Sequence, residues 1–287
     1  MTDADILIFK DNETYLKIQS EYPHILQEIS DYFTIEIPGA KYMPAYKKGW
    51  DGKLRLFNKR NNKLYIGLFS VLIDFLKSTE YTYVADNSLK YYEDISDEYI
   101  QKYIQSLELP YTMRDYQYRA LAITLRNKRA VIESSTGSGK SLIIYSIVRH
   151  YEDEKVLIIV PTISLTTQLY SDFRDYAKND EWSVEDNVHV ITAGVNKDAE
   201  KNIYLSTWQS LYELPKEYFQ QFHTVIVDET HGAQANSLKK ILENSTEACV
   251  RVGLTGTLQD TKTHLLVIQG LIGDIYKVSQ TSELQER

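Results

Sequence analysis

The stretch ESSTGSGKS, residues 133–141, decides the fold class of this chain. The phosphate-loop pattern G-x-x-x-x-G-K-[ST] asks for glycine where this sequence has Ser134, so the match is incomplete and the neighbouring residues must settle it. The apolar run RAVIE precedes the stretch, and SLIIYSIVRHY, of helical length, follows. A strand, a glycine-rich turn and a helix in this order predict a phosphate-binding loop, because backbone N–H groups and the helix N-terminus converge there. A flexible glycine-serine turn is the alternative.

Apolar runs of four to six residues alternate with helix-length segments between residues 113 and 280. These runs are AVIES, VLIIVP, NVHVIT, NIYLST, TVIVDE and VRVGLT. Runs that are apolar on both faces are typical of parallel strands covered by helices on both sides. We therefore expect one α/β domain over residues 109–287, with about six strands in a mostly parallel sheet.

The first part of the chain has a different pattern of apolar residues. Short strand-like runs are mixed with two helix-like stretches at residues 14–32 and 70–78, and KLRLF and KLYIGL, joined by NKRNN, predict a β-hairpin with a basic loop. An acidic, tyrosine-rich segment then contains an amphipathic helix capped by Ser96. We interpret this helix as a connector that ends a smaller α+β domain, residues 1–108.

The overall composition excludes several classes of protein. No run of 18 apolar residues exists, the N-terminus lacks the features of a signal peptide, and 43% of the 287 residues are hydrophobic. The single cysteine, Cys249, excludes an internal disulfide and multi-cysteine metal sites, and His231 has no second His or Cys at the spacing of a zinc site. These features predict a protein of the reducing cytoplasm, without a membrane partner.

Charge is unevenly distributed along the chain. The formal net charge is −8, yet residues 41–63 hold eight Lys and Arg against one acid, Asp51, with aromatic residues between them. Clustering of positive charge in one segment is informative about the binding partner of a protein and not about its fold. We predict that this segment contacts the phosphate backbone of DNA, a solvated basic face being the alternative. The residues expected to make the contact are Lys53, Arg55, Lys59, Arg60 and Lys63.

A second constellation, TVIVDETH at residues 224–231, places Asp228 and Glu229 at the end of a strand. In open α/β sheets ligands bind at that edge, although an acidic pair alone is often a solvated turn. Beside a phosphate loop, the pair predicts attack of water on the γ-phosphate of a bound nucleotide. Asp228 and Ser141 are expected to hold Mg²⁺, Lys140 to reach the β- and γ-phosphates, and Glu229 to activate water. The loop residues expected to surround the nucleotide are Ser135, Thr136, Gly137, Ser138, Gly139, Lys140 and Ser141.

Taken in order, the motifs of residues 113–257 resemble those of the first, RecA-like motor domain of superfamily-2 DExH helicases and translocases. SSTGSGKS is similar to motif I, DETH to motif II and TGT at residues 255–257 to motif III. MRDYQ resembles the adenine-recognising Q motif, VPTISLTTQL motif Ia and STWQSL motif Ib. The resemblance implies adenine recognition by Gln117 with Arg114 or a nearby tyrosine. It also implies phosphate-backbone contacts at Thr162 and Thr207, and coupling through His231, Thr255 and Thr257.

The whole chain, including GWDGKLRLFNKR, is similar to the recombination helicases of T-even phages. This implies an ATP-dependent motor, a monomer in the cytoplasm of an infected host, that acts on duplex, forked or junction DNA and on RNA–DNA hybrids. Branch migration, fork regression and R-loop unwinding are the implied roles. A motor also needs a second RecA-like domain with arginine fingers, for which the sequence after motif III leaves no room. We therefore expect an N-terminal portion that binds ATP and DNA with little hydrolysis.

Three alternatives remain at this point. One is a different P-loop enzyme, such as a kinase or small GTPase, which leaves MRDYQ and the motif Ia and Ib runs unexplained. Another is a nucleotide-gated DNA-binding or loading protein without motor activity. Within the translocases, the motifs do not separate a restriction-type from a transcription-coupled motor.

Overall fold

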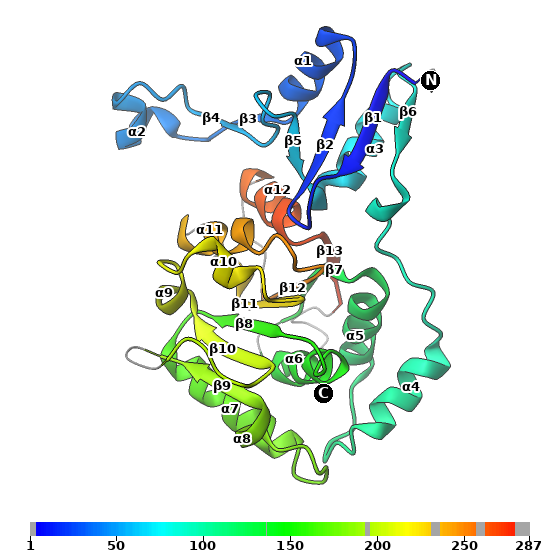
Figure 1. Ribbon diagram of the computed structural model, residues 1–287, viewed down its shortest axis with the longest axis vertical. Coiled ribbons are helices and arrows are strands. Elements are labelled where there is room, and N and C mark those ends of the chain that lie inside the picture. Colours follow the sequence, from blue (N-terminus) through cyan, green and yellow to red (C-terminus); the bar gives the residue numbers. More distant parts are fainter. Residues whose placement is uncertain (1–3, 136, 193–195, 231–235, 257–261, 279–287) are drawn as a thin grey trace. The chain divides into compact units, whose positions relative to one another are not determined.

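The structure, a computed structural model, describes residues 4–135, 137–192, 196–230, 236–256 and 262–278 (Figure 1). The chain forms two compact units. Unit 1 comprises residues 1–90 and 260–271, and unit 2 comprises residues 91–259 and 272–287. The predicted boundary at residue 108 falls inside unit 2, because the connector helix α4 (Asp97–Ser106) buries Ile100 completely in the core of that unit. Its predicted cap is present: the Ser96 hydroxyl accepts a hydrogen bond from the Tyr99 N–H.

Unit 2 is built on a seven-stranded sheet in which all neighbouring strands are parallel, in the order β13-β7-β12-β11-β8-β10-β9 (Figure 1). Six strands correspond to the predicted apolar runs: β7 (Arg129–Glu133), β8 (Val156–Val160), β9 (Val188–Ile191), β10 (Ile203–Thr207), β11 (Thr224–Asp228) and β12 (Val250–Thr255). The seventh, β13 (Asp274–Lys277), was not predicted, because DIYK is short and half polar. The α/β fold with a parallel sheet is confirmed.

Helices cover both faces of this sheet (Figure 1). One group of neighbours contains α5 (Asp115–Asn127), α6 (Lys140–His150) and α7 (Ile163–Tyr176), and the other contains α9 (Trp208–Leu211), α10 (Lys216–Phe219) and α11 (Asn236–Asn244). A further short helix, α8 (Val184–Asn187), precedes β9. Because the strands are parallel, β7 and β11 end at the same edge of the sheet, with β12 between them. This arrangement brings the phosphate loop and the acidic pair to one edge.

Unit 1 contains a four-stranded sheet in the order β5-β2-β1-β6 and a separate two-stranded ribbon, β3-β4. The strands are β1 (Ile6–Lys10), β2 (Tyr15–Gln19), β3 (Thr34–Glu36), β4 (Lys53–Arg55), β5 (Lys63–Tyr65) and β6 (Tyr83–Ala85). The helices are α1 (Pro23–Tyr32), η1 (Ala40–Tyr42), α2 (Pro44–Lys47), η2 (Ile66–Leu68), α3 (Phe69–Lys77), η3 (Asn87–Leu89) and α12 (Lys262–Leu271). No helix in the described residues has the length and apolar character needed to cross a membrane.

Two predictions for this region were wrong. Residues 15–19 form β2 rather than the first half of a helix, because they alternate in burial and pair with both β1 and β5. The predicted hairpin is reduced to a single bridge between Asn58 and Lys63, since β4 pairs with β3 and β5 pairs with β2. Each strand of the expected hairpin has a partner elsewhere.

Candidate nucleotide-binding site and basic cavity

The phosphate loop connects β7 to α6 through two glycines whose φ angles, +80° at Gly137 and +74° at Gly139, favour glycine. A Cβ at Gly139 would lie 2.5 Å from the Gln117 Nε2 atom, so the Gln117 amide would have to move to admit a side chain. Ser134, which stands where the pattern asks for glycine, is fully buried and donates from its hydroxyl to Ser138 Oγ at 2.8 Å. The departure from the pattern thus adds a hydrogen bond across the loop.

Gln117 of α5 joins the predicted adenine-recognition segment to this loop. Its Nε2 atom donates to the carbonyl oxygens of Ser138 at 2.9 Å and Gly139 at 3.3 Å, and its Oε1 atom accepts from the Arg114 N–H at 2.9 Å. The Arg114 guanidinium donates to the Tyr116 hydroxyl at 2.9 Å. Gln117 therefore holds the position of the loop before any base is bound.

The acidic pair lies next to the loop lysine. Asp228 ends β11 and accepts from the Glu229 N–H at 3.0 Å, while Glu229 has a φ of +54°, uncommon for a non-glycine residue. The Lys140 Nζ atom lies 3.4 Å from Glu229 Oε1, and these side chains are only 11% and 23% exposed. The Gly256 N–H donates to Glu229 Oε2 at 3.5 Å. The structure thus brings together Lys140, Glu229 and the start of the TGT segment, and backbone strain of this kind clusters at functional sites.

The expected magnesium ligands are both oxygen donors. Mg²⁺ is usually held by one or two carboxylates together with phosphate oxygens and water, so Asp228 and the Ser141 hydroxyl fit this ion. Ser141 Oγ lies 2.8 Å from the Tyr176 hydroxyl, and if Ser141 is the donor its oxygen keeps lone pairs for a metal. In the described part of the chain no group of three or more His, Cys, Asp or Glu residues is arranged to hold a metal. A nucleotide-bound Mg²⁺ does not require such a group.

A cleft of about 660 Å³ adjoins the loop. Its lining includes the predicted Arg114 and Gln117, and also four residues that were not identified from the sequence: Tyr111, Asp172, Asp175 and Tyr176. Tyr111 donates from its hydroxyl to Asp175 Oδ2 at 2.5 Å, and burial raises the pKa of the Asp172 carboxyl. The sequence signal was the spacing of residues 172, 175 and 176, which places them on one face of α7.

The remaining predicted motor residues have different surroundings. Thr255 is buried, and its carbonyl accepts from the Ser134 N–H at 2.9 Å, which joins motif III to motif I. Thr162 is exposed and caps α7 by accepting from the Leu165 N–H at 3.3 Å. Thr207 is buried, and its hydroxyl lies 3.2 Å from Ser210 Oγ. Thr136, His231 and Thr257 lie outside the described residues.

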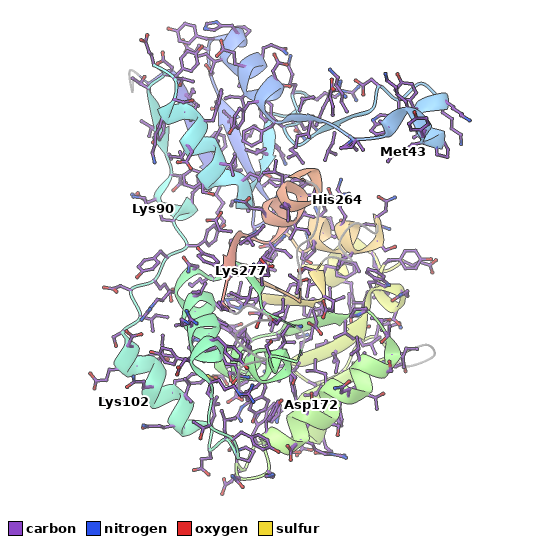
Figure 2. The ribbon with its side chains drawn as sticks, turned by 180° about the vertical axis from the view of Figure 1, so that it is seen from behind. Met43, Lys90, Lys102, Asp172, His264 and Lys277 are labelled. Atoms are coloured by element: carbon purple, nitrogen blue, oxygen red, sulfur yellow. The ribbon has the colours of Figure 1, made fainter. Side chains whose placement is uncertain are left out.

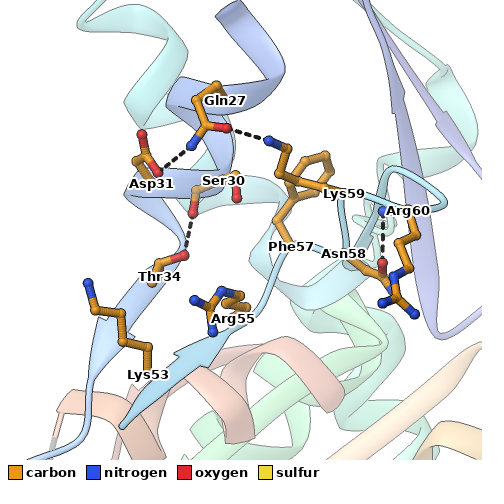
Figure 3. A pocket seen from close by; sticks show the side chains of 10 residues that line it. All are labelled: Gln27, Ser30, Asp31, Thr34, Lys53, Arg55, Phe57, Asn58, Lys59 and Arg60. Atoms are coloured by element: carbon orange, nitrogen blue, oxygen red, sulfur yellow. Dashed lines mark hydrogen bonds between the residues drawn. The ribbon is translucent and has the colours of Figure 1, made fainter. Parts of the chain in front are cut away.

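Unit 1 contains a second cavity, of about 630 Å³, between α1, the β3-β4 ribbon and residues 57–60 (Figure 3). Four of the five predicted DNA-contacting cations line it, with one acid, Asp31. These cations are Lys53, Arg55, Lys59 and Arg60. The fifth, Lys63, is not in the lining and forms an ion pair with Asp11 at 2.7 Å.

The cations of this cavity differ in their pairing. Arg55 pairs with Asp51, and this hydrogen bond lowers the pKa of Asp51 to about 2. Lys59 donates to the neutral Gln27 side chain (Figure 3). Within the described residues, neither Lys59 nor Arg60 has an acidic partner within 4.0 Å. Part of the positive charge is therefore available to an anionic ligand.

Residues 110–260, more than half of the chain, match the family described as type III restriction enzyme, res subunit. The chain belongs to this family. Residues 5–86 match a second family, the N-terminal region of the DNA helicase UvsW.

The ATP-dependent DNA helicase uvsW of Enterobacteria phage T4 is 31% identical over 295 residues, covering 98% of this chain and 58% of that protein. A crystal structure of the T4 UvsW helicase superposes with a TM-score of 0.86 at 29% identity, covering 95% of this chain and 99% of that one. The DNA 3′-5′ translocase XPB2 of Sulfurisphaera tokodaii is 30% identical over 202 residues, covering 68% of this chain and 43% of that protein. The chain therefore spans about half the length of these curated relatives. The predicted resemblance to phage helicases is confirmed.

Proposed function

We propose that this chain is part of an ATP-dependent DNA helicase or translocase that acts on branched DNA and RNA–DNA hybrids in recombination, repair and replication. The observation that carries the proposal is the Lys140–Glu229 contact of 3.4 Å at the sheet edge where the phosphate loop begins. A phosphate-binding cation and a candidate catalytic carboxylate, both largely buried, lie side by side there. The similarity to the ATP-dependent DNA helicase uvsW over 98% of the chain supports ATP and DNA as the ligands.

In this proposal each residue of the site has a separate task. Lys140 and the loop N–H groups bind the β- and γ-phosphates, and Gln117 with Arg114 and Tyr111 receives the adenine. Ser141 and Asp228 would hold a nucleotide-bound Mg²⁺, which would supply neutralisation of the charge on the phosphates. Because a bound triphosphate competes for Lys140, it releases the Glu229 carboxylate, which then accepts the proton of the attacking water.

Hydrolysis at a useful rate also needs an arginine finger, which contributes about 10³–10⁵ to the rate in related ATPases and GTPases. We propose that a second RecA-like domain supplies it, and that His231, Thr255 and Thr257 couple nucleotide state to DNA. In the absence of such a domain, ATP and DNA should bind with little turnover. Robust DNA-stimulated hydrolysis without it would contradict this part of the proposal.

In unit 1, we propose that the cations of the basic cavity bind the phosphate backbone of DNA. Backbone contacts give affinity without sequence preference, and log K falls with log salt at a slope of about −0.9 for each phosphate neutralised on duplex DNA. The concave lining with four cations and one acid supports this assignment.

Two binding measurements test the proposal. The first follows a fluorescent ATP analogue with Mg²⁺, for which Lys140→Ala should abolish detectable binding. The second titrates single-stranded, duplex and forked DNA over a salt range against a variant with Lys53, Arg55, Lys59 and Arg60 changed to Gln. A matched control changes four exposed lysines to Gln: Lys77, Lys102, Lys178 and Lys216.

We expect the cavity variant to lose at least tenfold in DNA affinity and to show a shallower salt slope, and the control to lose much less. Equal losses in both variants would mean that net charge alone governs binding. No loss in the cavity variant would remove the basic cavity from the DNA-binding surface. Unchanged ATP binding by Lys140→Ala would refute the nucleotide site.

A further inference from the structure

Unit 1 carries an arm that the proposed function leaves unexplained. The β3-β4 ribbon leads to a tip at residues 41–49, KYMPAYKKG, in which all nine residues are exposed. Three of them are large and apolar: Tyr42 is 90% exposed, and Met43 and Tyr46 are each 39% exposed. Figure 2 shows Met43 near the far end of this arm. Exposed apolar groups gathered at a projecting point indicate an interaction surface.

The backbone of the arm tip is held in a defined conformation. The Met43 N–H donates to the Ala40 carbonyl at 3.0 Å, the Trp50 N–H donates to the Ala45 carbonyl at 3.2 Å, and the Trp50 indole N–H donates to the Lys53 carbonyl at 3.1 Å. Gly52 lies against Ala40 so closely that a Cβ would be 2.8 Å from the Ala40 Cβ. The small buried residues thus close the base of the tip, and the large rings remain outside.

The positive charge of the arm tip indicates an anionic partner. Lys41, Lys47 and Lys48 lie within residues 41–49, and no acidic residue does. Cations beside exposed aromatic rings are the combination that binds unpaired nucleic-acid strands, because phosphates pair with the cations and every base has a face that can stack. The tip is also continuous with the basic cavity, since Lys53 and Arg55 of β4 line that cavity.

We propose that the arm tip binds the unpaired strand at a DNA branch point by stacking bases on Tyr42 and Tyr46, with its lysines on the flanking phosphates. This inference rests on the proposed function, because it assumes that the basic cavity binds the adjacent backbone. The cavity supplies affinity for any DNA, and the tip supplies the preference for strands that are not paired. Branched DNA is the substrate that presents both features together.

The experiment uses the full chain and three fluorescent DNAs: an unpaired thymidine strand, a blunt duplex, and a fork with 2-aminopurine at the branch point. The variants are Tyr42→Ala, Tyr42→Ala with Tyr46→Ala, and the ring-preserving Tyr42→Phe with Tyr46→Phe. The matched control is Tyr92→Ala in unit 2, where the side chain is 62% exposed. Thermal unfolding of each variant confirms that the fold is intact.

We expect Tyr42→Ala to weaken binding of the single strand and the fork about tenfold, and the double variant to weaken it further, since stacking on one ring contributes about one to two orders of magnitude in affinity. Duplex affinity should change less than twofold, and the salt slope should stay the same because no charge is removed. Tyr42→Phe with Tyr46→Phe should bind as the parent does. Stacking should quench the fluorescence of 2-aminopurine in these two proteins, which have the rings, and not in the double alanine variant.

Equal weakening on all three DNAs, or none on any, would overturn the inference while the basic cavity remains as proposed. Failure of the parent to bind any DNA would overturn both proposals.

Discussion

Lys140 and Glu229 hold each other in the nucleotide-free site. At 3.4 Å, with both side chains largely buried, each charge reduces the cost of burying the other. A nucleotide must exchange this contact for one between Lys140 and phosphate. Glu229 also opposes the triphosphate directly, because both are negative. The same carboxylate that prepares the site for chemistry therefore weakens nucleotide binding.

Glu229→Gln is expected to raise the affinity for Mg²⁺ and ATP about threefold, which corresponds to about 0.7 kcal/mol, because it removes the carboxylate that competes for Lys140 and repels the phosphates. Lys140→Ala should remove binding, since it deletes the attractive partner. Titration with a fluorescent ATP analogue checks both variants. If Glu229→Gln weakens binding, the carboxylate holds the nucleotide rather than opposing it.

A second residue-scale prediction concerns the two loop glycines. Gly139→Ala should lower the free energy of unfolding of unit 2 by more than Gly137→Ala does. In both variants alanine in a left-handed backbone costs about 1 kcal/mol. Only the Cβ at residue 139 also contacts the Gln117 side chain and displaces it. Nucleotide affinity should fall with Gly139→Ala as the loop shifts away from Gln117. Urea unfolding and nucleotide titration of both variants make the comparison. Equal effects would mean that the Gln117 contact is not restrictive.

At the scale of elements, sequence patterns predicted unit 2 better than unit 1. The six buried strands of unit 2 are continuous apolar runs, and their partners follow from one parallel arrangement. In unit 1 the strands are three to five residues long, and which strand pairs with which depends on contacts far apart in sequence. KLRLF and KLYIGL have the spacing of a hairpin, yet the strand in KLRLF pairs with β3 and the strand in KLYIGL pairs with β2.

The residues of the candidate site also fall into those that local sequence patterns identify and those that depend on tertiary contacts. Lys140, Glu229 and Gln117 were found because their motifs are local and ordered along the chain. Asp172 and Tyr176 were missed because they reach the cleft only when α7 packs beside α6, a contact that no local pattern specifies. The DNA contact of Thr207 stays a prediction from its motif. Its burial could not be predicted, because burial depends on neighbours that the motif does not include.

The packing of α4 against α6 gives an element-scale prediction. The rings of Tyr99 and Tyr103 on α4 lie edge-on to His150 of α6, at centroid distances of 6.3 and 5.1 Å. Burial lowers the pKa of His150 below its ordinary value of 6.5. Between 6.5 and that lower value the unfolded chain binds more protons than the folded one, so the free energy of unfolding should fall as the pH falls through this window.

His150→Phe should therefore make unit 2 less sensitive to acid than the parent, because the ring remains and its titration is removed. Urea unfolding of both proteins at pH 7.5, 6.5 and 5.5 isolates this contribution, since the carboxylates titrate in both. Parallel pH dependences would show that His150 does not contribute.

At the scale of the whole molecule, the chain passes between its two units more than once. The strands β12 and β13 belong to unit 2, whereas α12, which lies between them in sequence, belongs to unit 1. Within unit 1, α12 contacts the short η2 helix. Unit 1 is thus completed by a segment that follows Thr255 by only a few residues, and a fragment ending at Lys90 would lack part of its own unit.

Gly67→Ala tests how tightly α12 is held in unit 1. A Cβ at Gly67 would lie 2.0 Å from the Gln269 carbonyl oxygen, which is backbone and cannot rotate away, so α12 must move. We expect unit 1 to lose about 1–3 kcal/mol of stability, as overpacking usually costs, and the amides of residues 262–271 to exchange hydrogen faster. Hydrogen exchange followed by mass spectrometry measures the second effect.

The control is Gly49→Ala, which meets no atom within 4 Å but has a φ of +94°, so it carries a conformational cost without displacing α12. Unchanged exchange over residues 262–271 in Gly67→Ala would mean that α12 is not held by this contact. Faster exchange in Gly67→Ala alone would show that α12 is held in unit 1 by its close packing against Gly67.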